Sequence, residues 1–150
     1  MPKVDLESLE PSNRTGYPPP FDKDVAGRWY RRLGPAAGLA DIGVSHVVLE
    51  PGAWSSQRHW HEGIDEFVVM LDGEAVLVEE KGETVMRSGD CAAFPKNAPN
   101  GHHLVNRSES RCAFLAFDCR YGEGDCHYPD IDLLYQAEQD RYARKDGSPY

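Results

Sequence analysis

The sequence lacks any long apolar run. Its uncharged hydrophobic stretches are only a few residues long, whereas a membrane-crossing helix needs roughly 18 consecutive apolar residues. The first residues, 1–13 (MPKVDLESLEPSN), carry acidic side chains and no apolar segment of the kind found in secretory signals. We therefore expect a cytoplasmic protein without a membrane partner.

Basic residues and cysteines are both scarce. The chain has 16 Lys and Arg against 25 Asp and Glu, which gives a net charge of −9. This charge repels phosphate backbones, so we do not expect nucleic acid as a partner. The four cysteines include no CxxC pair, and nothing indicates export, so we expect reduced thiols rather than disulfides.

Amphipathic helical patterns are missing between residues 25 and 118, whereas turn signals are abundant. Gly and Pro together supply 14 and 11 of the 150 residues. Short apolar runs alternate with turn dipeptides such as Asp72-Gly73, which is a strong hairpin signal. A chain of this length suits one domain, and roughly ten short strands predict an all-β sandwich or barrel.

The chain divides into three predicted segments. Residues 1–24 form a proline-rich N-terminal arm, in which 18–20 (PPP) favours extended geometry. Residues 25–118 hold the strands. Residues 119–150 are expected to be a mostly irregular C-terminal extension that packs on the barrel, with one short helix within 135–145.

One group of histidines and a carboxylate predicts a metal site. His59 and His61 lie two residues apart on a predicted strand, so their side chains point the same way. A turn over 62–65 brings Glu66 alongside, and His102 on another strand can complete the set. Three imidazoles and one carboxylate suit Zn, Mn, Fe, Ni or Cu, and coordination positions left open are typical of a catalytic metal.

These residues carry a family resemblance. Residues 52–73 (GAWSSQRHWHEGIDEFVVMLDG) resemble the first signature of the cupins, with His59, His61, Glu66 and Gly73 in place. The departure there is Gly52, which lies one residue further from the first histidine than in the family pattern.

Residues 89–106 (GDCAAFPKNAPNGHHLVN) resemble the second cupin signature, with Gly89, Pro95, His102 and Asn106 matching. Asn97 replaces the glycine of the family's PxG, and Asn is the non-glycine residue that best tolerates a positive φ. The loop after it is longer than in the family, which leaves a choice between His102 and His103 as the fourth ligand. Strand parity favours His102.

The resemblance implies a single cupin β-barrel or jelly roll that holds one divalent transition metal ion on His59, His61, Glu66 and His102. It also implies a homodimer and a small-molecule ligand, as in small single-domain bacterial cupins. The implied activity is that of a metal-dependent enzyme acting on a small polar molecule, of the dioxygenase, isomerase, lyase or decarboxylase type. The alternative is a binding or sensing module without turnover.

Three further residues are candidate substrate contacts. His46 lies on the same face of a predicted strand as Val44 and Val48 and could act as a base. Gln57, on a predicted strand over residues 54–60, faces the same side as His59. Met70 shares a strand face with Glu66, where core packing is the simplest interpretation. No second carboxylate is an obvious base beside the metal.

Overall fold

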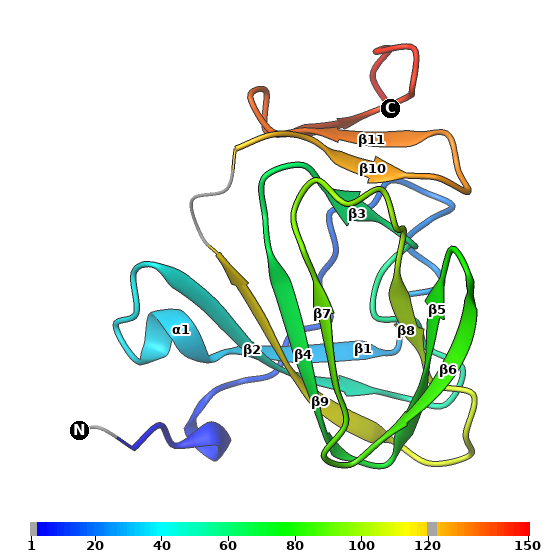
Figure 1. The fold of residues 1–150 in the computed structure, drawn as a ribbon. Helices are drawn as coiled ribbons and strands as arrows, with labels where there is room; N and C mark the ends of the chain where they lie inside the picture. Colours follow the sequence, from blue (N-terminus) through cyan, green and yellow to red (C-terminus); the bar gives the residue numbers. More distant parts are fainter. Residues whose placement is uncertain (1–2, 120–122) are drawn as a thin grey trace.

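The structure is a computed structural model that describes residues 3–119 and 123–150. It confirms the all-β prediction (Figure 1). Two short helices occur among the described residues, the 3-10 helix Leu6–Ser8 and α1 (Leu33–Ala36). The strands of the described residues are β1 (Arg28–Arg32), β2 (Ile42–Leu49), β3 (Trp60–His61), β4 (Glu66–Asp72), β5 (Glu74–Glu79), β6 (Gly82–Arg87), β7 (Cys91–Phe94), β8 (His103–Val105), β9 (Cys112–Cys119), β10 (Cys126–Tyr128), β11 (Leu133–Gln136) and β12 (Arg141–Ala143).

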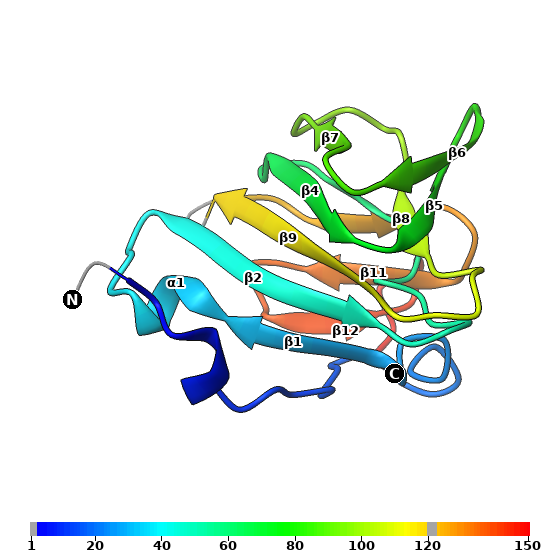
Figure 2. The same cartoon turned by 90° about the horizontal axis from the view of Figure 1, so that it is seen from below.

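The strands form three antiparallel sheets. The largest has the order β1-β2-β9-β4-β7, and it runs diagonally across the molecule in Figure 2. Facing it is the sheet β6-β5-β8, while β12-β11-β10-β3 lies across one end of both. We refer to β1–β9 as the body and to residues 123–150 as the C-terminal segment.

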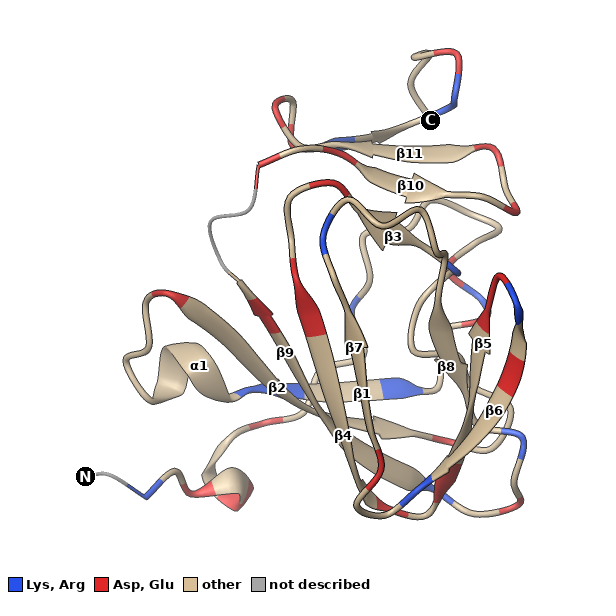
Figure 3. Cartoon of the chain, viewed as in Figure 1, with Lys and Arg blue, Asp and Glu red and all other residues tan. Residues whose placement is uncertain are grey.

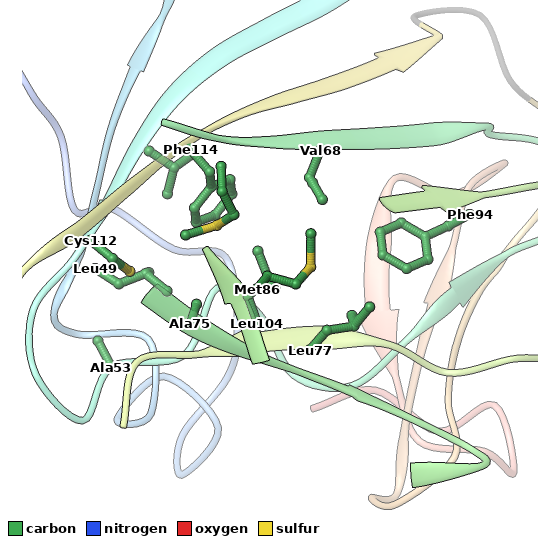
Figure 4. Close-up of a cluster of buried hydrophobic side chains, with 12 residues drawn as sticks. Leu49, Ala53, Val68, Ala75, Leu77, Met86, Phe94, Leu104, Cys112 and Phe114 are labelled. Atoms are coloured by element: carbon green, nitrogen blue, oxygen red, sulfur yellow. The ribbon is translucent and has the colours of Figure 1, made fainter. Parts of the chain in front are cut away.

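The core lies between the five-stranded sheet and the three-stranded sheet β6-β5-β8, because alternate residues of each strand point inward. In β4, Val68 and Met70 are buried, and Cys112 and Phe114 of β9 pack beside them (Figure 4). Leu77 on β5 closes the core from the facing sheet. Each fully buried side chain of this size stabilises the fold by about 1.5–3 kcal/mol.

Two turns hold the strands that carry the metal motif. Gly73 joins β4 to β5 with a φ of 69°, and a Cβ at this position would lie 2.8 Å from the Arg111 carbonyl oxygen. Asn97 adopts a φ of 57°, as expected for the residue that replaces glycine in the second signature. Its amide donates to the His61 carbonyl at 2.8 Å, which ties the loop before β8 to β3.

The C-terminal segment differs from the sequence prediction in one element. The helix expected within 135–145 is wrong, because β11 and β12 form a hairpin there with Tyr135 opposite Tyr142. Asp140 adopts a φ of 49° in the turn between them. The hairpin buries Leu133 completely, in a cluster with Tyr128 of β10 and the arm residue Tyr17.

The strand predicted over residues 54–60 is also wrong in part. Only Trp60 and His61 belong to a strand, β3, while Trp54 and His59 each make an isolated β-bridge. Among the described residues, no helix is both long enough and apolar enough to span a membrane.

Candidate metal centre and cavity

A cavity of about 700 Å³ opens between the body and the C-terminal segment, and His59, His61, Glu66 and His102 line part of it. Glu66 is the first residue of β4, and His61 ends β3. The backbones of His59 and His102 pair directly, the amide of each donating to the carbonyl of the other at 3.2 and 2.9 Å. The two signature motifs are therefore held together by main-chain hydrogen bonds.

The four side chains converge on one carboxylate oxygen. Glu66 Oε2 lies 2.9 Å from His102 Nε2, 3.5 Å from His59 Nε2 and 3.7 Å from His61 Nε2. The structure thus brings together the four residues that the sequence analysis selected as metal ligands.

The other ring nitrogen of two histidines is already bonded. His59 Nδ1 lies 2.9 Å from the Gln57 carbonyl, and His102 Nδ1 lies 3.0 Å from the Asn100 carbonyl. A carbonyl oxygen only accepts, so each Nδ1 donates to its carbonyl, and each Nε2 faces Glu66 and the cavity. Metal-binding histidines are usually held in this way. The donor set therefore fits a divalent metal.

Burial and the Glu66 charge set the protonation of the cluster. Burial lowers the pKa of His61 to about 4, which keeps this imidazole neutral. Burial also acts to lower the pKa of His59, but hydrogen bonding to Glu66 and its charge outweigh this and raise it. Burial acts to raise the pKa of Glu66, but hydrogen bonds from His102 and His59 hold it far below its usual range. Glu66 is thus a permanent carboxylate.

The C-terminal segment adds Cys126 to the cluster. Cys126 pairs with His61 across β10 and β3, and directly opposed residues of an antiparallel pair project on the same side. Cys126 is 3% exposed. Its sulfur and the ligand atoms of His59 and His61 all lie within 4.8 Å of one another. Burial raises its pKa to about 12. Tyr128, two residues on, also lines the cavity.

A basic face lines another part of the cavity. Arg28, Tyr30 and Arg32 alternate along β1, and all three line the cavity together with Arg14 of the arm. Arg28 donates to the Ser55 carbonyl at 2.7 Å, whereas its buried Nε has no hydrogen-bond partner. Figure 3 shows β1 basic at both ends in a molecule with many acidic loops. This part of the cavity wall is thus basic although the chain carries a charge of −9.

Asp118 supplies a second carboxylate at the mouth of the cavity. It pairs with Glu66 across β9 and β4 and lines the cavity. Its side chain lies over Gly43 of β2, where an added Cβ would overlap the carboxylate. Glycine at this position therefore leaves room for Asp118.

The structure does not bring the three candidate substrate contacts to the cavity. His46 alternates with the lining residues Ser45 and Val47 and is not among the lining residues itself. Gln57 is 4% exposed and donates to the Phe21 carbonyl and to Asp24, both at 2.9 Å, so it anchors the arm. Met70 is 1% exposed and belongs to the core.

His103, the alternative fourth ligand, also lines the cavity. Its Nδ1 lies 2.9 Å from the Ser56 carbonyl, and its ring packs edge-on against Trp54. His102, not His103, is hydrogen-bonded to Glu66.

Sequence reasoning missed Arg28, Asp118 and Cys126. Alternation along residues 28–32 (RWYRR, now β1) places Arg28 and Arg32 on one face, and this signal could have indicated a basic cavity wall. Asp118 could have been found from the parity of β9. No local signal identifies Cys126, because its position depends on pairing between β10 and β3.

Comparisons with known proteins support the same family as the motifs. Residues 45–118 match the family model described as Cupin domain. No curated protein matches the chain.

Solved structures match over much more of the chain. A sugar phosphate isomerase of the cupin superfamily from Silicibacter pomeroyi is 44% identical, with a TM-score of 0.94 over 99% of this chain and 96% of that one. A putative sugar phosphate isomerase from Acidithiobacillus ferrooxidans is 26% identical, with a TM-score of 0.72 over 77% and 74% of the two chains.

The polyketide cyclase RemF from Streptomyces resistomycificus shares the fold at 16% identity, with a TM-score of 0.69 over 87% of each chain. The fold therefore hosts several chemistries. With 44% identity across nearly its whole length to a cupin, this chain belongs to the cupin superfamily.

Proposed function

We propose that the protein is a metal-dependent isomerase of phosphorylated sugars. The observation that carries this proposal is that one cavity combines the His59, His61, Glu66 and His102 cluster with the basic face of β1. The resemblance to the Silicibacter pomeroyi sugar phosphate isomerase supports it. At about 700 Å³, the cavity lies in the ~300–1,000 Å³ range of small-molecule sites.

The two parts of the cavity have complementary roles. His59, His61, Glu66 and His102 would hold a divalent ion, which would supply polarisation of the sugar carbonyl. Arg28 holds the phosphate, because it lines the cavity and a guanidinium forms strong charge-assisted hydrogen bonds with phosphate oxygens. Arg14 and Arg32 add positive charge around the same group.

The tyrosines of the cavity act as hydrogen-bond donors to sugar oxygens. Burial raises the pKa of both Tyr17 and Tyr128 well above the usual value, so both phenols stay protonated at neutral pH. They line the cavity on the side of the arm and the C-terminal segment.

We assign proton transfer to Asp118. Interconversion of an aldose and a ketose removes a proton from the hydroxyl-bearing carbon beside the carbonyl and returns one to the former carbonyl carbon, while the hydroxyl proton passes to the former carbonyl oxygen. A carboxylate paired with Glu66 across the sheet lies beside the ion's ligands, where it can make both transfers. General acid–base catalysis of this kind contributes roughly 10²–10⁴-fold.

The test is a nuclear magnetic resonance assay of zinc-, manganese- and iron-loaded protein against a panel of pentose and hexose phosphates and the same sugars without phosphate. We expect turnover of phosphorylated sugars alone. Asp118→Asn should lower kcat roughly 10²–10⁴-fold while metal content is kept. Arg28→Gln should raise KM roughly 10–100-fold, and the exposed Arg111→Gln, just before β9 and at the opposite end of that strand from Asp118, should change neither.

Two outcomes contradict the proposal. Tight binding of a sugar phosphate without turnover by any metal form would favour the binding or sensing module. Equal turnover of sugars with and without phosphate would remove the role of the basic face.

We also propose a homodimer, supported by apolar side chains on the outer face of the largest sheet. Ile42 and Phe67 are 46% and 40% exposed, and with Phe117 they line a shallow depression there. Light scattering should give twice the 16.8 kDa mass, and Phe67→Asp should give the monomer. A monomeric wild type would contradict the homodimer.

A further inference from the structure

The C-terminal segment places a row of side chains over the metal cluster. His61, Cys126, Tyr135 and Tyr142 are consecutive partners across β3, β10, β11 and β12. Residues opposed in this way project on the same side of the sheet, and all four line the cavity. Cys126 therefore faces the same space as the imidazoles because of sheet register.

The distances suit a shared ion. The ligand atoms of His59, His61 and Cys126 all lie within 4.8 Å of one another, and so do those of His59, Glu66 and His102. Metal–nitrogen bonds of about 2.0–2.1 Å and metal–sulfur bonds of about 2.3 Å allow two donors of one ion to lie up to about 4.4 Å apart. His59 belongs to both triplets, so an ion beside His59 lies near the sulfur as well as near Glu66 and His102. The five donors do not form one group at this distance, so coordination by all five requires side chains to move toward the ion.

We propose that Cys126 is a fifth ligand of the metal ion. This inference rests on the metal centre of the proposed function but not on its reaction. On binding, the thiol releases one proton, as coordinated thiols do. The thiolate and Glu66 then balance the two positive charges of the ion, which lowers the cost of holding it in a buried site.

A sulfur ligand changes which metal ion the site prefers. Thiolate is a soft ligand that suits zinc and copper, whereas manganese prefers carboxylate and water oxygens. Cys126 should therefore raise the preference of the site for zinc over manganese beyond that of three histidines and a carboxylate.

The test uses the full chain, freed of metal and loaded with one equivalent of Co²⁺. We expect a thiolate-to-cobalt charge-transfer band in the near ultraviolet, and X-ray absorption should show one sulfur scatterer at about 2.3 Å. Cys126→Ser should lose both signals and bind zinc at least roughly 10–100-fold more weakly, the range that loss of an outer-shell partner already costs. Manganese affinity should change less.

Cys91→Ser is the matched control, because Cys91 is exposed on β7, and it should keep both signals. Cobalt bound by the wild type without a sulfur scatterer would overturn the proposal, and this measurement needs no variant to fold. If wild-type protein bound no stoichiometric metal, the metal centre itself would be wrong. A sulfur-ligated ion without isomerase activity would overturn only the proposed isomerase reaction.

Discussion

The body and the C-terminal segment reach the same cavity by different routes. In the body, the site residues come from two signature motifs whose strands are joined by short turns, and His59 pairs directly with His102. In the C-terminal segment, Cys126 and Tyr128 reach the site because β10 pairs with β3, about sixty residues earlier in the chain. Local spacing thus encodes one part of the site, and long-range strand pairing encodes the other.

The largest expected effect is the loss of metal binding when a histidine of the body is replaced. His102→Ala should abolish stoichiometric metal binding, because it removes the imidazole hydrogen-bonded to Glu66 at 2.9 Å. Titration calorimetry with zinc should show a loss of affinity beyond the roughly 10–100-fold typical of outer-shell changes. His103→Ala is the matched control, and we expect it to keep one bound ion. A reversed pattern would move the ligand to His103.

The next effect tests whether the C-terminal segment is an integral part of the fold. Leu133→Ala should lower the free energy of unfolding by about 2–5 kcal/mol, because the side chain is completely buried. Leu134→Ala, on the opposite face of β11 and only half-buried, should cost less than about 1 kcal/mol. Urea unfolding measures both. Equal, small effects would indicate that the segment packs loosely.

A smaller effect is expected from Gln57, which holds the N-terminal arm and does not line the cavity. Gln57→Leu leaves the Phe21 carbonyl and Asp24 without their donor, and an unmet buried acceptor costs about 1–3 kcal/mol. Thermal unfolding should detect this loss while zinc affinity stays unchanged. A drop in sugar-phosphate affinity with normal stability would instead restore Gln57 as a substrate contact.

The smallest effect concerns the ion pair between the body and the C-terminal segment. Arg58 donates to both carboxylate oxygens of Asp130, at 2.7 and 2.6 Å, and this hydrogen bonding lowers the pKa of Asp130. Because the folded pKa lies below the unfolded value, the pair stabilises the protein above about pH 4. That contribution is lost as the pH falls through the folded pKa.

The Asp130 side chain is 55% exposed, so Asp130→Asn should cost only about 0.5–1 kcal/mol at pH 7. Urea unfolding across the acid range should show wild type and variant converging at low pH. A constant difference between them would mean that the pair does not act through the charge of Asp130.

The difference between local spacing and long-range strand pairing explains which parts of the fold and of the site could be predicted from the sequence. Alternation and turn chemistry were enough for the all-β class and for the turn at Asn97, because both depend on neighbours in the chain. Tyr135 and Tyr142 were expected in a helix, since the hairpin that pairs them is stabilised by the distant Tyr17 and Tyr128. His46 is not among the cavity-lining residues, and strand parity alone does not say which face of a strand is inside.

One measurement tests directly whether body and C-terminal segment build a single metal centre. An anomalous difference map from a crystal of the cobalt-loaded protein should show one peak within bonding distance of His59, His61, Glu66 and His102. We predict that Cys126 Sγ lies about 2.3 Å from the same peak. A peak bound by the body residues with the sulfur well outside bonding distance, or no peak in this cavity, would contradict that claim.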